Sequence, residues 1–146
     1  MPLSIIDTFN RFAEAFEAAV QDDNWLRLNE YLAEDATYIN VGGPDPKAVG
    51  RDAVIAFFKA DVSNNDRRFD TRTLLALTRP VTEGNRLSRR WRCIYTLADT
   101  PDLVVEGEAR YCFENDLIKS IEEEITNESI QRLADWMEKY GSRFDT

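Results

Sequence analysis

The chain has 146 residues, of which 43% are hydrophobic and 31% are charged, and its formal net charge is −9. This length and composition fit one ordinary domain, so we expect residues 1–146 to share a single hydrophobic core. The acidic balance argues against a nucleic-acid partner, because affinity for phosphate comes from clustered Lys and Arg.

Two helices are predicted at the N-terminus. The first spans 4–20, where apolar residues recur at helical spacing, and Ser4 followed by Asp7 resembles a capping box at its start. The second spans 23–33, with its apolar residues on one face. Both helices therefore have one side suited to packing against a sheet.

The next segment alternates between elements. A short strand is predicted at 36–41, followed by a loop at 42–50 that contains two prolines and three glycines. A third helix is predicted at 51–62, with its apolar residues turned inward.

After residue 65 the pattern becomes that of strands. Residues 68–80 begin with the alternation of a strand and then lose it, as a more buried strand would, and residues 83–85 read as a hairpin turn. Three longer strands follow at 86–97, 103–114 and 117–126. An amphipathic helix is predicted at 127–140, with Gly141 as its C′ residue.

This order of elements predicts an α+β fold, because the helices are segregated from a meander of antiparallel strands. We expect a strongly curved antiparallel sheet, shaped as a cone, to wrap around the N-terminal helices. The additional C-terminal helix would follow the last strand. Such a sheet would enclose a conical cavity.

Three stretches carry a resemblance to a known superfamily: "YLAEDATYIN" from Tyr31, the proline-containing loop, and "GRDAV" from Gly50. With the order of elements, they resemble the nuclear transport factor 2-like superfamily, which includes SnoaL-like polyketide cyclases, ketosteroid isomerases and limonene epoxide hydrolases. The resemblance covers nearly the whole chain. It implies the fold more strongly than the reaction, since one fold hosts many functions.

The resemblance to ketosteroid isomerases does not extend to their catalytic residues. Those enzymes use an aspartate base, a tyrosine and a protonated aspartate. The matching positions here are Asn40, Phe16 and Ala109, none of which can take the corresponding role. We therefore set that route aside.

The resemblance to epoxide hydrolases extends further. In that family a Tyr and an Asn hold a water, an Asp on the last strand takes its proton, a second Asp protonates the epoxide, and an Arg links the two acids. The resemblance implies Tyr38 and Asn40 around the water, Glu123 as base, and Arg90 as the linking arginine. Arg92 falls at the position of the second acid, where it would stabilise negative charge or bind a substrate carboxylate.

The composition limits other chemistry. The chain has no histidine, which removes Ser-His-Asp and Cys-His catalysis and the commonest metal ligand. Cys93 and Cys112 lack CxxC spacing and cannot complete a zinc site, so we expect two small thiols. No nucleotide or flavin motif appears, and we expect neither a metal nor a cofactor.

The register of strand 86–97 decides which side chains line the cavity. If Arg90 and Arg92 point inward, Trp91 and Tyr95 point outward. That register gathers both arginines with Glu123, Tyr38 and Asn40 inside apolar walls, and we adopt it. The opposite register would place Trp91, Cys93 and Tyr95 inside and both arginines in water, and a single bulge would produce it. The predicted ligand contacts are Arg92, Tyr111, Trp25 and Phe16.

Two effects oppose each other at Glu123. Burial would raise its pKa, whereas neighbouring guanidinium groups would lower it, and with Arg90 and Arg92 nearby we expect the second effect to dominate. Glu123 would then be a carboxylate at neutral pH. Structural roles remain open for the same residues: Tyr38 and Asn40 as hydrogen bonds in the wall, and Arg90 with Glu123 as an ion pair.

Three functions follow from this site. The first is a SnoaL-like enzyme, a hydrolase, cyclase or isomerase that acts on a small apolar oxygenated substrate with Glu123 as general base. The second is a non-catalytic small-ligand-binding or accessory protein. The third is an assembly module whose cone is filled by side chains. The candidates for that filling are Phe9, Phe16, Phe57 and Phe113.

The partners follow from the same register. Many members of the superfamily pair through the outer sheet face, and Trp91 and Tyr95 would lie there among charges, so we expect a homodimer. No apolar run approaches the ~20 residues of a membrane helix, and the first residues lack the pattern of a signal peptide. We therefore expect no membrane partner and a cytoplasmic location.

Overall fold

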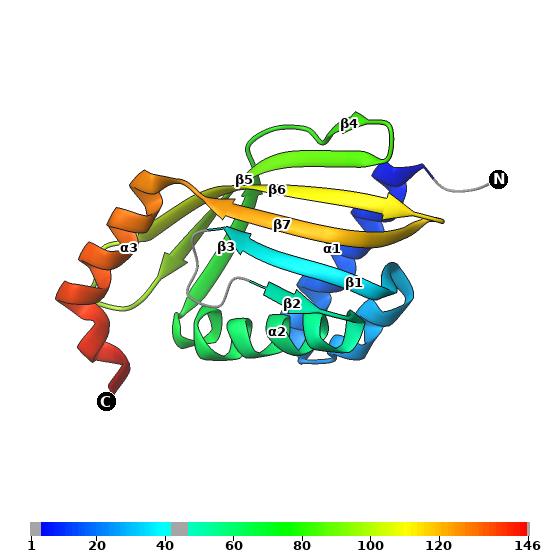
Figure 1. The fold of residues 1–146 in the computed structure, drawn as a ribbon. Coiled ribbons are helices and arrows are strands. Elements are labelled where there is room, and N and C mark those ends of the chain that lie inside the picture. The colour runs from blue at the N-terminus through cyan, green and yellow to red at the C-terminus, as the bar shows by residue number, and fades with distance from the viewer. Residues whose placement is uncertain (1–3, 42–46, 146) are drawn as a thin grey trace.

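The structure, a computed structural model, describes residues 4–41 and 47–145. Within them, helices accompany one curved sheet with strand order β2-β1-β7-β6-β5-β3, and β4 pairs with β5 (Figure 1). No helix in these residues is long and apolar enough to cross a membrane. The predicted α+β class is confirmed, with one sheet and separate helices.

Helix α1 spans Ile5–Asp22 and begins as predicted. The backbone N–H of Asp7 donates to the Ser4 side chain at 3.1 Å, which satisfies one of the free donors of the first turn. Phe9 and Phe12 are buried on the side that faces the sheet, where both rings contact Tyr111. The helix ends at Asp23, whose φ of 62° takes the chain out of the helix.

The second predicted helix is only partly correct. Residues Trp25–Tyr31 form a short 3-10 helix, η1, and strand β1 (Leu32–Val41) begins four residues before the predicted start at 36. The strand starts early because Leu32 already pairs with Ile118 of β7 and is fully buried there. Strand prediction missed this pairing, since its partner lies far along the sequence.

The predicted loop at 42–50 contains a strand. Strand β2 (Lys47–Val49) pairs antiparallel with β1, while residues 42–46 lie outside the described part of the chain. Helix α2 (Arg51–Asn64) follows Gly50, whose φ of 95° favours glycine. Its buried residues pack against the aromatic core and β1: Val54, Ile55, Phe58 and Val62.

The strand predicted at 68–80 is shorter in the structure, and a further strand follows it. A 3-10 turn, η2 (Asp66–Arg68), precedes strand β3 (Thr71–Ala76), and β4 (Val81–Glu83) forms a hairpin with β5. The turn predicted at 83–85 is confirmed, with Gly84 at a φ of 60°.

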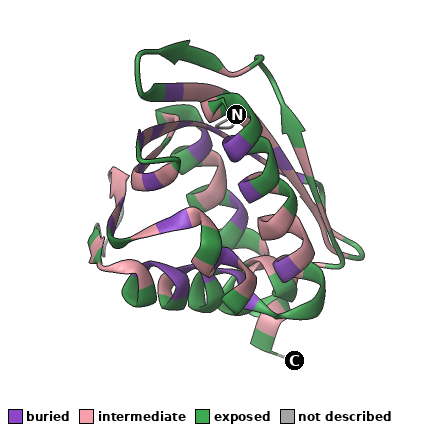
Figure 2. Ribbon diagram, turned by 90° about the vertical axis from the view of Figure 1, so that its right-hand side faces the viewer, coloured by how far each residue is buried: buried purple, intermediate pink, exposed green. Residues whose placement is uncertain are grey.

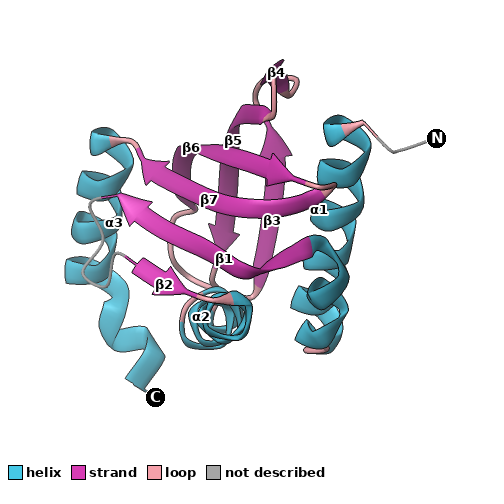
Figure 3. Cartoon of the chain, turned by 45° about the vertical axis from the view of Figure 1, so that its right-hand side comes forward, coloured by secondary structure: helices cyan, strands magenta, loops and turns pink. Residues whose placement is uncertain are grey.

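The three long strands form the predicted meander. They are β5 (Arg86–Thr96), β6 (Leu103–Glu114) and β7 (Leu117–Ile125), paired antiparallel in chain order. Strand β1 then joins β7 in parallel, so the sheet is mixed and not wholly antiparallel. Figure 3 shows the sheet curving between α1, α2 and α3.

Strand β6 defines two faces of the sheet. Its residues alternate between buried and partly exposed up to the exposed Glu114. Figure 2 maps the buried, intermediate and exposed residues onto the ribbon. We call the buried side, which carries Ala109 and Tyr111 and faces α1, the inner face. The opposite side, which carries Glu106, Glu108 and Arg110, is the outer face.

The predicted inward position of Arg90 and Arg92 is wrong. Arg90 pairs with Glu108 and Arg92 pairs with Glu106, and residues directly opposite in a ladder share a face, so both arginines lie on the outer face. Arg92 forms an ion pair with Glu106 at 2.9 Å. The charges of the neighbouring strand thus select the opposite register.

The inward side of β5 carries the aromatic residues. Trp91 pairs with Gly107, and a Cβ on that glycine would lie 2.6 Å from Cζ2 of the indole, so only glycine leaves room for the ring. Tyr95 packs with Phe69, at 4.7 Å between ring centroids. Neither aromatic residue is available to an outer dimer face, and the homodimer itself stays a prediction.

Helix α3 (Asn127–Tyr140) covers the part of β6 that extends beyond β7. The N–H of Glu106 donates to Ser129 Oγ at 2.8 Å, Arg132 Nη1 donates to the Val104 carbonyl at 2.8 Å, and Trp136 Nε1 donates to the Pro101 carbonyl at 3.0 Å. Trp136 is buried against Leu103 and Val105. The helix therefore replaces a strand along this edge. Gly141 is right-handed (φ −57°) because the chain continues as a 3-10 helix, so it is not the left-handed C′ residue predicted.

Candidate functional site

A tyrosine and a glutamate from neighbouring strands meet on the inner face. Tyr38 Oη donates a hydrogen bond to Glu123 Oε2 at 3.0 Å. Tyr38 lies on β1 and is 4% exposed, and its ring packs against Phe57 with the centroids 4.7 Å apart. The packed ring holds the hydroxyl against the carboxylate.

The sheet register places Glu123 in a polar row between two largely apolar rows. The polar row crosses β5, β6, β7 and β1 in the order Arg89, Ala109, Glu123, Asn40. On one side the row is Leu87, Tyr111, Ile121, Tyr38. On the other side it is Trp91, Gly107, Ile125. Since strands lie about 4.8 Å apart, the small Ala109 leaves Arg89 and Glu123 separated by roughly two strand spacings.

Burial raises the pKa of Glu123. The hydrogen bond from Tyr38 lowers this pKa, the Asp61 carboxylate raises it further, and Arg89 and Arg72 lower it, with an overall increase. A base whose pKa lies closer to neutral pH transfers protons more effectively than an ordinary glutamate.

The expectation that arginines would hold this pKa down is wrong. It relied on Arg90 and Arg92, which lie on the other side of the sheet. The predicted structural ion pair between Arg90 and Glu123 is excluded for the same reason.

Tyr38 and Tyr111 both keep their phenolic protons. Burial raises the pKa of Tyr38, and the Glu123 carboxylate raises it further. Burial likewise raises the pKa of Tyr111. Tyr38 therefore acts as a hydrogen-bond donor to Glu123 over the ordinary pH range.

Two buried donors near this row lack acceptors. In the residues that the structure describes, Arg89 Nε and Trp91 Nε1 are buried and have no hydrogen-bond partner. The Arg89 guanidinium lies 4.9 Å from the centroid of the Phe9 ring. Sequence reasoning did not select Arg89 for the site. Its inner position follows from its pairing with Ala109, which lies on the buried side of strand 103–114.

A second polar cluster lies at the junction of α1, η2 and β3. Arg72 bonds to Glu17 at 2.6 Å and to Asp66 at 2.7 Å. Burial raises the pKa of Asp66 to about 6, although Arg72 opposes this increase. A pocket of about 370 Å³ opens beside it, lined by Val20, Gln21, Asp66, Arg67, Phe69, Asp70, Thr71 and Arg72. The three charged partners satisfy one another, so this cluster is primarily structural.

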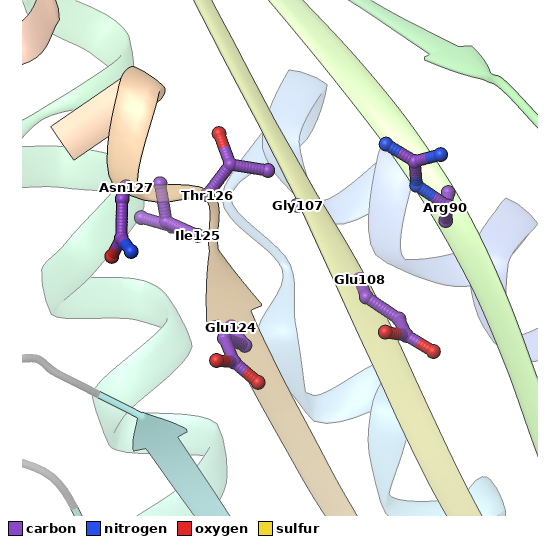
Figure 4. Close-up of a pocket in the computed structure, with 7 residues that line it drawn as sticks. All are labelled: Arg90, Gly107, Glu108, Glu124, Ile125, Thr126 and Asn127. Atoms are coloured by element: carbon purple, nitrogen blue, oxygen red, sulfur yellow. The ribbon is translucent and has the colours of Figure 1, made fainter.

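Another pocket, of about 300 Å³, lies beside the outer face (Figure 4). Arg90, Glu108 and Glu124 project from neighbouring strands there, with the remaining lining from Gly107, Ile125, Thr126 and Asn127. Glu123 lines neither this pocket nor the one beside Asp66. Arg90 is thus separated by the sheet from the residues it was predicted to assist.

Of the predicted ligand contacts, three lie in the aromatic core. Phe16 packs edge-on against Trp25 at 5.3 Å, and Tyr111 packs edge-on against Phe9 at 5.0 Å. The indole of Trp25 already donates to Asp23 at 2.8 Å. Arg92 is excluded from this side by its outer position, whereas ligand contact by the three aromatic residues stays a prediction.

The remaining candidates for unusual chemistry are few. Cys93 is buried and Cys112 half-buried, and both are free thiols. Over residues 4–41 and 47–145, no three Cys, Asp or Glu side chains group in a way that would hold a metal ion.

Comparison with known proteins identifies a matching family model and similar folds. A family model described as a SnoaL-like domain matches residues 12–121, a segment that ends before Glu123 and α3. No curated protein sequence matches the chain.

Several solved structures share the fold at low sequence identity. Bal32a from a soil-derived mobile gene cassette has a TM-score of 0.66 at 15% identity, covering 91% of this chain and 98% of its own. An NTF2-like protein from Burkholderia pseudomallei has a TM-score of 0.65 at 16% identity, covering 90% and 98%. TerC, crystallised with polyporic acid, has a TM-score of 0.65 at 10% identity, covering 88% and 98%. At these identities the likeness shows the cone-shaped α+β fold alone.

Proposed function

This chain belongs to the family of SnoaL-like domains, and from that premise we propose that it is a small-molecule enzyme with Glu123 as general base. The substrate would be a small, largely apolar, oxygenated compound bound against the inner face. The reaction would be a proton transfer of the isomerase or cyclase type. The hydrogen bond between Tyr38 and Glu123, at 3.0 Å, is the observation that carries the proposal.

Glu123, Tyr38 and Asn40 each have a role in this reaction. The Glu123 carboxylate takes a proton from the substrate and returns it later in the cycle, and its raised pKa suits both steps. Tyr38 holds one carboxylate oxygen, which leaves the other free to face the substrate. Asn40, directly opposite Glu123 in the ladder, offers an amide to a substrate oxygen or a bound water.

The surroundings of Glu123 favour a small organic ligand. Apolar rows flank the polar row on both sides, and a few polar groups within apolar walls are typical of small-molecule sites. The crystallisation of the relative TerC with polyporic acid is consistent with this class of ligand.

Hydrolysis of the epoxide-hydrolase type is less well supported than proton transfer. That mechanism needs a second acid near the base, and the inner position next to Arg89 on β5 is Trp91. An indole cannot supply a proton as a general acid. The same absence favours a second candidate function, a non-catalytic small-ligand-binding protein.

The proposal is tested by comparing two neighbouring glutamates. Turnover and hydrogen–deuterium exchange are measured for a panel of small apolar ketones, esters and epoxides with wild type, Glu123→Gln and Glu122→Gln. Glu122 lies on the outer face, where Arg110 Nε contacts it at 2.7 Å, so its variant is the matched control. We expect Glu123→Gln to lose about 10²–10⁴-fold in rate and Glu122→Gln to keep the wild-type rate.

Equal loss in both variants, or none in either, would contradict the role of Glu123. Compounds that bind without reacting would favour the non-catalytic candidate.

A further inference from the structure

The unpaired donors of β5 are unusual for a folded protein. A buried N–H without an acceptor costs about 1–3 kcal/mol, and native structures keep few of them. Here Arg89 Nε and Trp91 Nε1 are both without partners among the described residues, and they occupy successive inner-face positions on one strand. Two such donors side by side indicate that an acceptor from outside the chain completes them.

The fold itself prevents these donors from finding acceptors. Their neighbours across the ladder are Ala109 and Gly107, which have no polar side chain. The indole of Trp91 is held over Gly107, where a Cβ would lie 2.6 Å from Cζ2, and the Arg89 guanidinium is held over the ring of Phe9. Both groups are therefore fixed in place before any ligand arrives.

Asn29 Oδ1 and Arg51 Nε are also buried without a partner among the described residues, but the other two tryptophans each have an acceptor. Trp25 Nε1 donates to Asp23 at 2.8 Å, and Trp136 Nε1 donates to the Pro101 carbonyl at 3.0 Å. Only the indole that lies beside the Glu123 row lacks an acceptor.

Arg89 also has no direct ion-pair partner within the described residues, although its charge lowers the pKa of Glu123. It takes part in none of their ion pairs, although Arg92 and Arg110 on the outer face are both paired with glutamates. Glu123 lies in the same row, but Ala109 separates the two and the carboxylate is bonded to Tyr38. A half-buried guanidinium in this position favours an anion as its partner.

We propose that Arg89 and Trp91 form a carboxylate-binding subsite and that the ligand of the inner face is therefore an organic acid. Both side chains are donors only, which excludes an ammonium or other donor group at this point. A guanidinium N–H and an indole N–H two residues apart can each bond one oxygen of a carboxylate. This inference rests on the proposed function for the position of the reacting atom, which would lie at Glu123, roughly two strand spacings from Arg89.

The indole protons provide a direct test. The chain has three tryptophans, so ¹H–¹⁵N spectra contain three indole signals, and that of Trp91 is assigned from Trp91→Phe. Benzoate and phenylacetate are titrated into the wild type, with benzamide and benzyl alcohol as neutral probes. We expect the carboxylates to move the Trp91 signal saturably downfield and to leave Trp25 and Trp136 nearly unchanged.

Two arginines provide the matched variants. Arg89→Gln is expected to weaken benzoate binding about tenfold or more, through loss of a charge-assisted hydrogen bond, whereas Arg90→Gln on the outer face keeps wild-type affinity. Equal effects of the two variants, equal shifts by the neutral probes, or no larger shift at Trp91 than at the other two indoles would overturn the subsite. In the last case water alone completes the donors. Should Arg89→Gln not fold, the wild-type shift decides the question.

Failure of this inference is distinguishable from failure of the proposed function. Glu123→Gln is expected to keep the Trp91 shift and to lose turnover. Turnover that depends on Glu123 without a shift at Trp91 would overturn the subsite alone. A carboxylate-dependent shift with full activity in Glu123→Gln would overturn the general base alone.

Discussion

The two faces of the same three strands treat their charges in opposite ways. On the outer face, Arg110 contacts Glu108 at 3.3 Å, Glu122 at 2.7 Å and Glu124 at 3.0 Å. On the inner face, Arg89 and Trp91 hold unpaired buried donors. On the outer face Arg92 and Arg110 are paired with glutamates and partly solvated, while the inner face carries few charges and leaves buried donor atoms without partners among the described residues.

This difference indicates that the outer charges keep the surface solvated, whereas the inner polar groups are available for binding or catalysis. Exposed ion pairs contribute little to stability, typically below about 1 kcal/mol. Buried groups with shifted pKa values and missing partners are costly, and they concentrate at functional sites. The inner face of β5–β7 therefore carries the candidate site, although the outer face carries more charge.

The largest effect is expected at Gly107, where the inner face has no spare volume. A Cβ there would lie 2.6 Å from Cζ2 of Trp91 and 2.7 Å from the Glu124 carbonyl oxygen, so Gly107→Ala should destabilise the protein by about 1–3 kcal/mol. Urea unfolding measures the change. Gly141→Ala is the control, because its nearest neighbour atoms, in Met137, lie 3.8 Å away. A loss below about 0.5 kcal/mol at Gly107 would mean that the sheet relaxes easily.

Next in size is removal of the donor to Glu123. Tyr38→Phe leaves the half-buried Glu123 carboxylate without its hydrogen bond, which should cost about 1–2 kcal/mol at neutral pH. The pKa of Glu123 should rise further, because the bond from Tyr38 lowers it. Chemical denaturation and the pH profile of activity measure the two effects, and an unchanged profile would separate Tyr38 from the base.

Glu123→Gln is expected to change stability less than Tyr38→Phe and to increase it. The amide oxygen of the glutamine still accepts the hydrogen bond from the Tyr38 hydroxyl. Burial raises the pKa of Glu123 above its ordinary 4.5, so the folded protein binds this proton more tightly than the unfolded chain. Stability from this group is greatest below pH 4.5 and falls as the pH rises toward the folded pKa, after which the loss is constant.

Glu123→Gln has no ionisable group at this position, so its stability does not fall as the pH rises through the folded pKa of Glu123. Its Tm should exceed that of wild type at pH 8, and the difference should close near pH 4. A Tm difference independent of pH would show that the Glu123 charge is well accommodated.

The smallest effect is expected on the outer face. Arg110→Met removes three ion pairs at once, yet it should change stability by less than about 1 kcal/mol, because the partners are partly solvated. The change should shrink further in high salt. A loss above about 2 kcal/mol, well beyond the usual range for exposed pairs, would remove the contrast between the two faces.

The sequence predicted the frame of this fold because its signals were local. Ser4 and Asp7 marked the start of α1, Gly84 marked the hairpin turn, and the alternation of 103–114 fixed the inner face of β6. Glu123 was correctly assigned to the inner face by the same alternation in β7.

The register of β5 could not be predicted from that strand alone. Arginines occur at 86, 89, 90 and 92, so both faces of 86–97 carry charge and the pattern has no clear phase. The neighbouring strand decides it: Gly107 admits the Trp91 ring, and Glu106 and Glu108 attract the arginines opposite them. The predicted decrease in the pKa of Glu123 assumed that Arg90 and Arg92 face it, so the error in the register of β5 also gave the wrong direction for this pKa.

The way α3 covers β6 has a consequence beyond the site. Ser129, Arg132 and Trp136 occupy main-chain groups at Glu106, Val104 and Pro101 that no strand pairs on that side. Open strand edges are templates for strand addition between molecules. We therefore expect the C-terminal helix to prevent strand pairing between molecules. A chain ending at Ile125 would expose the unpaired edge of β6 and should self-associate.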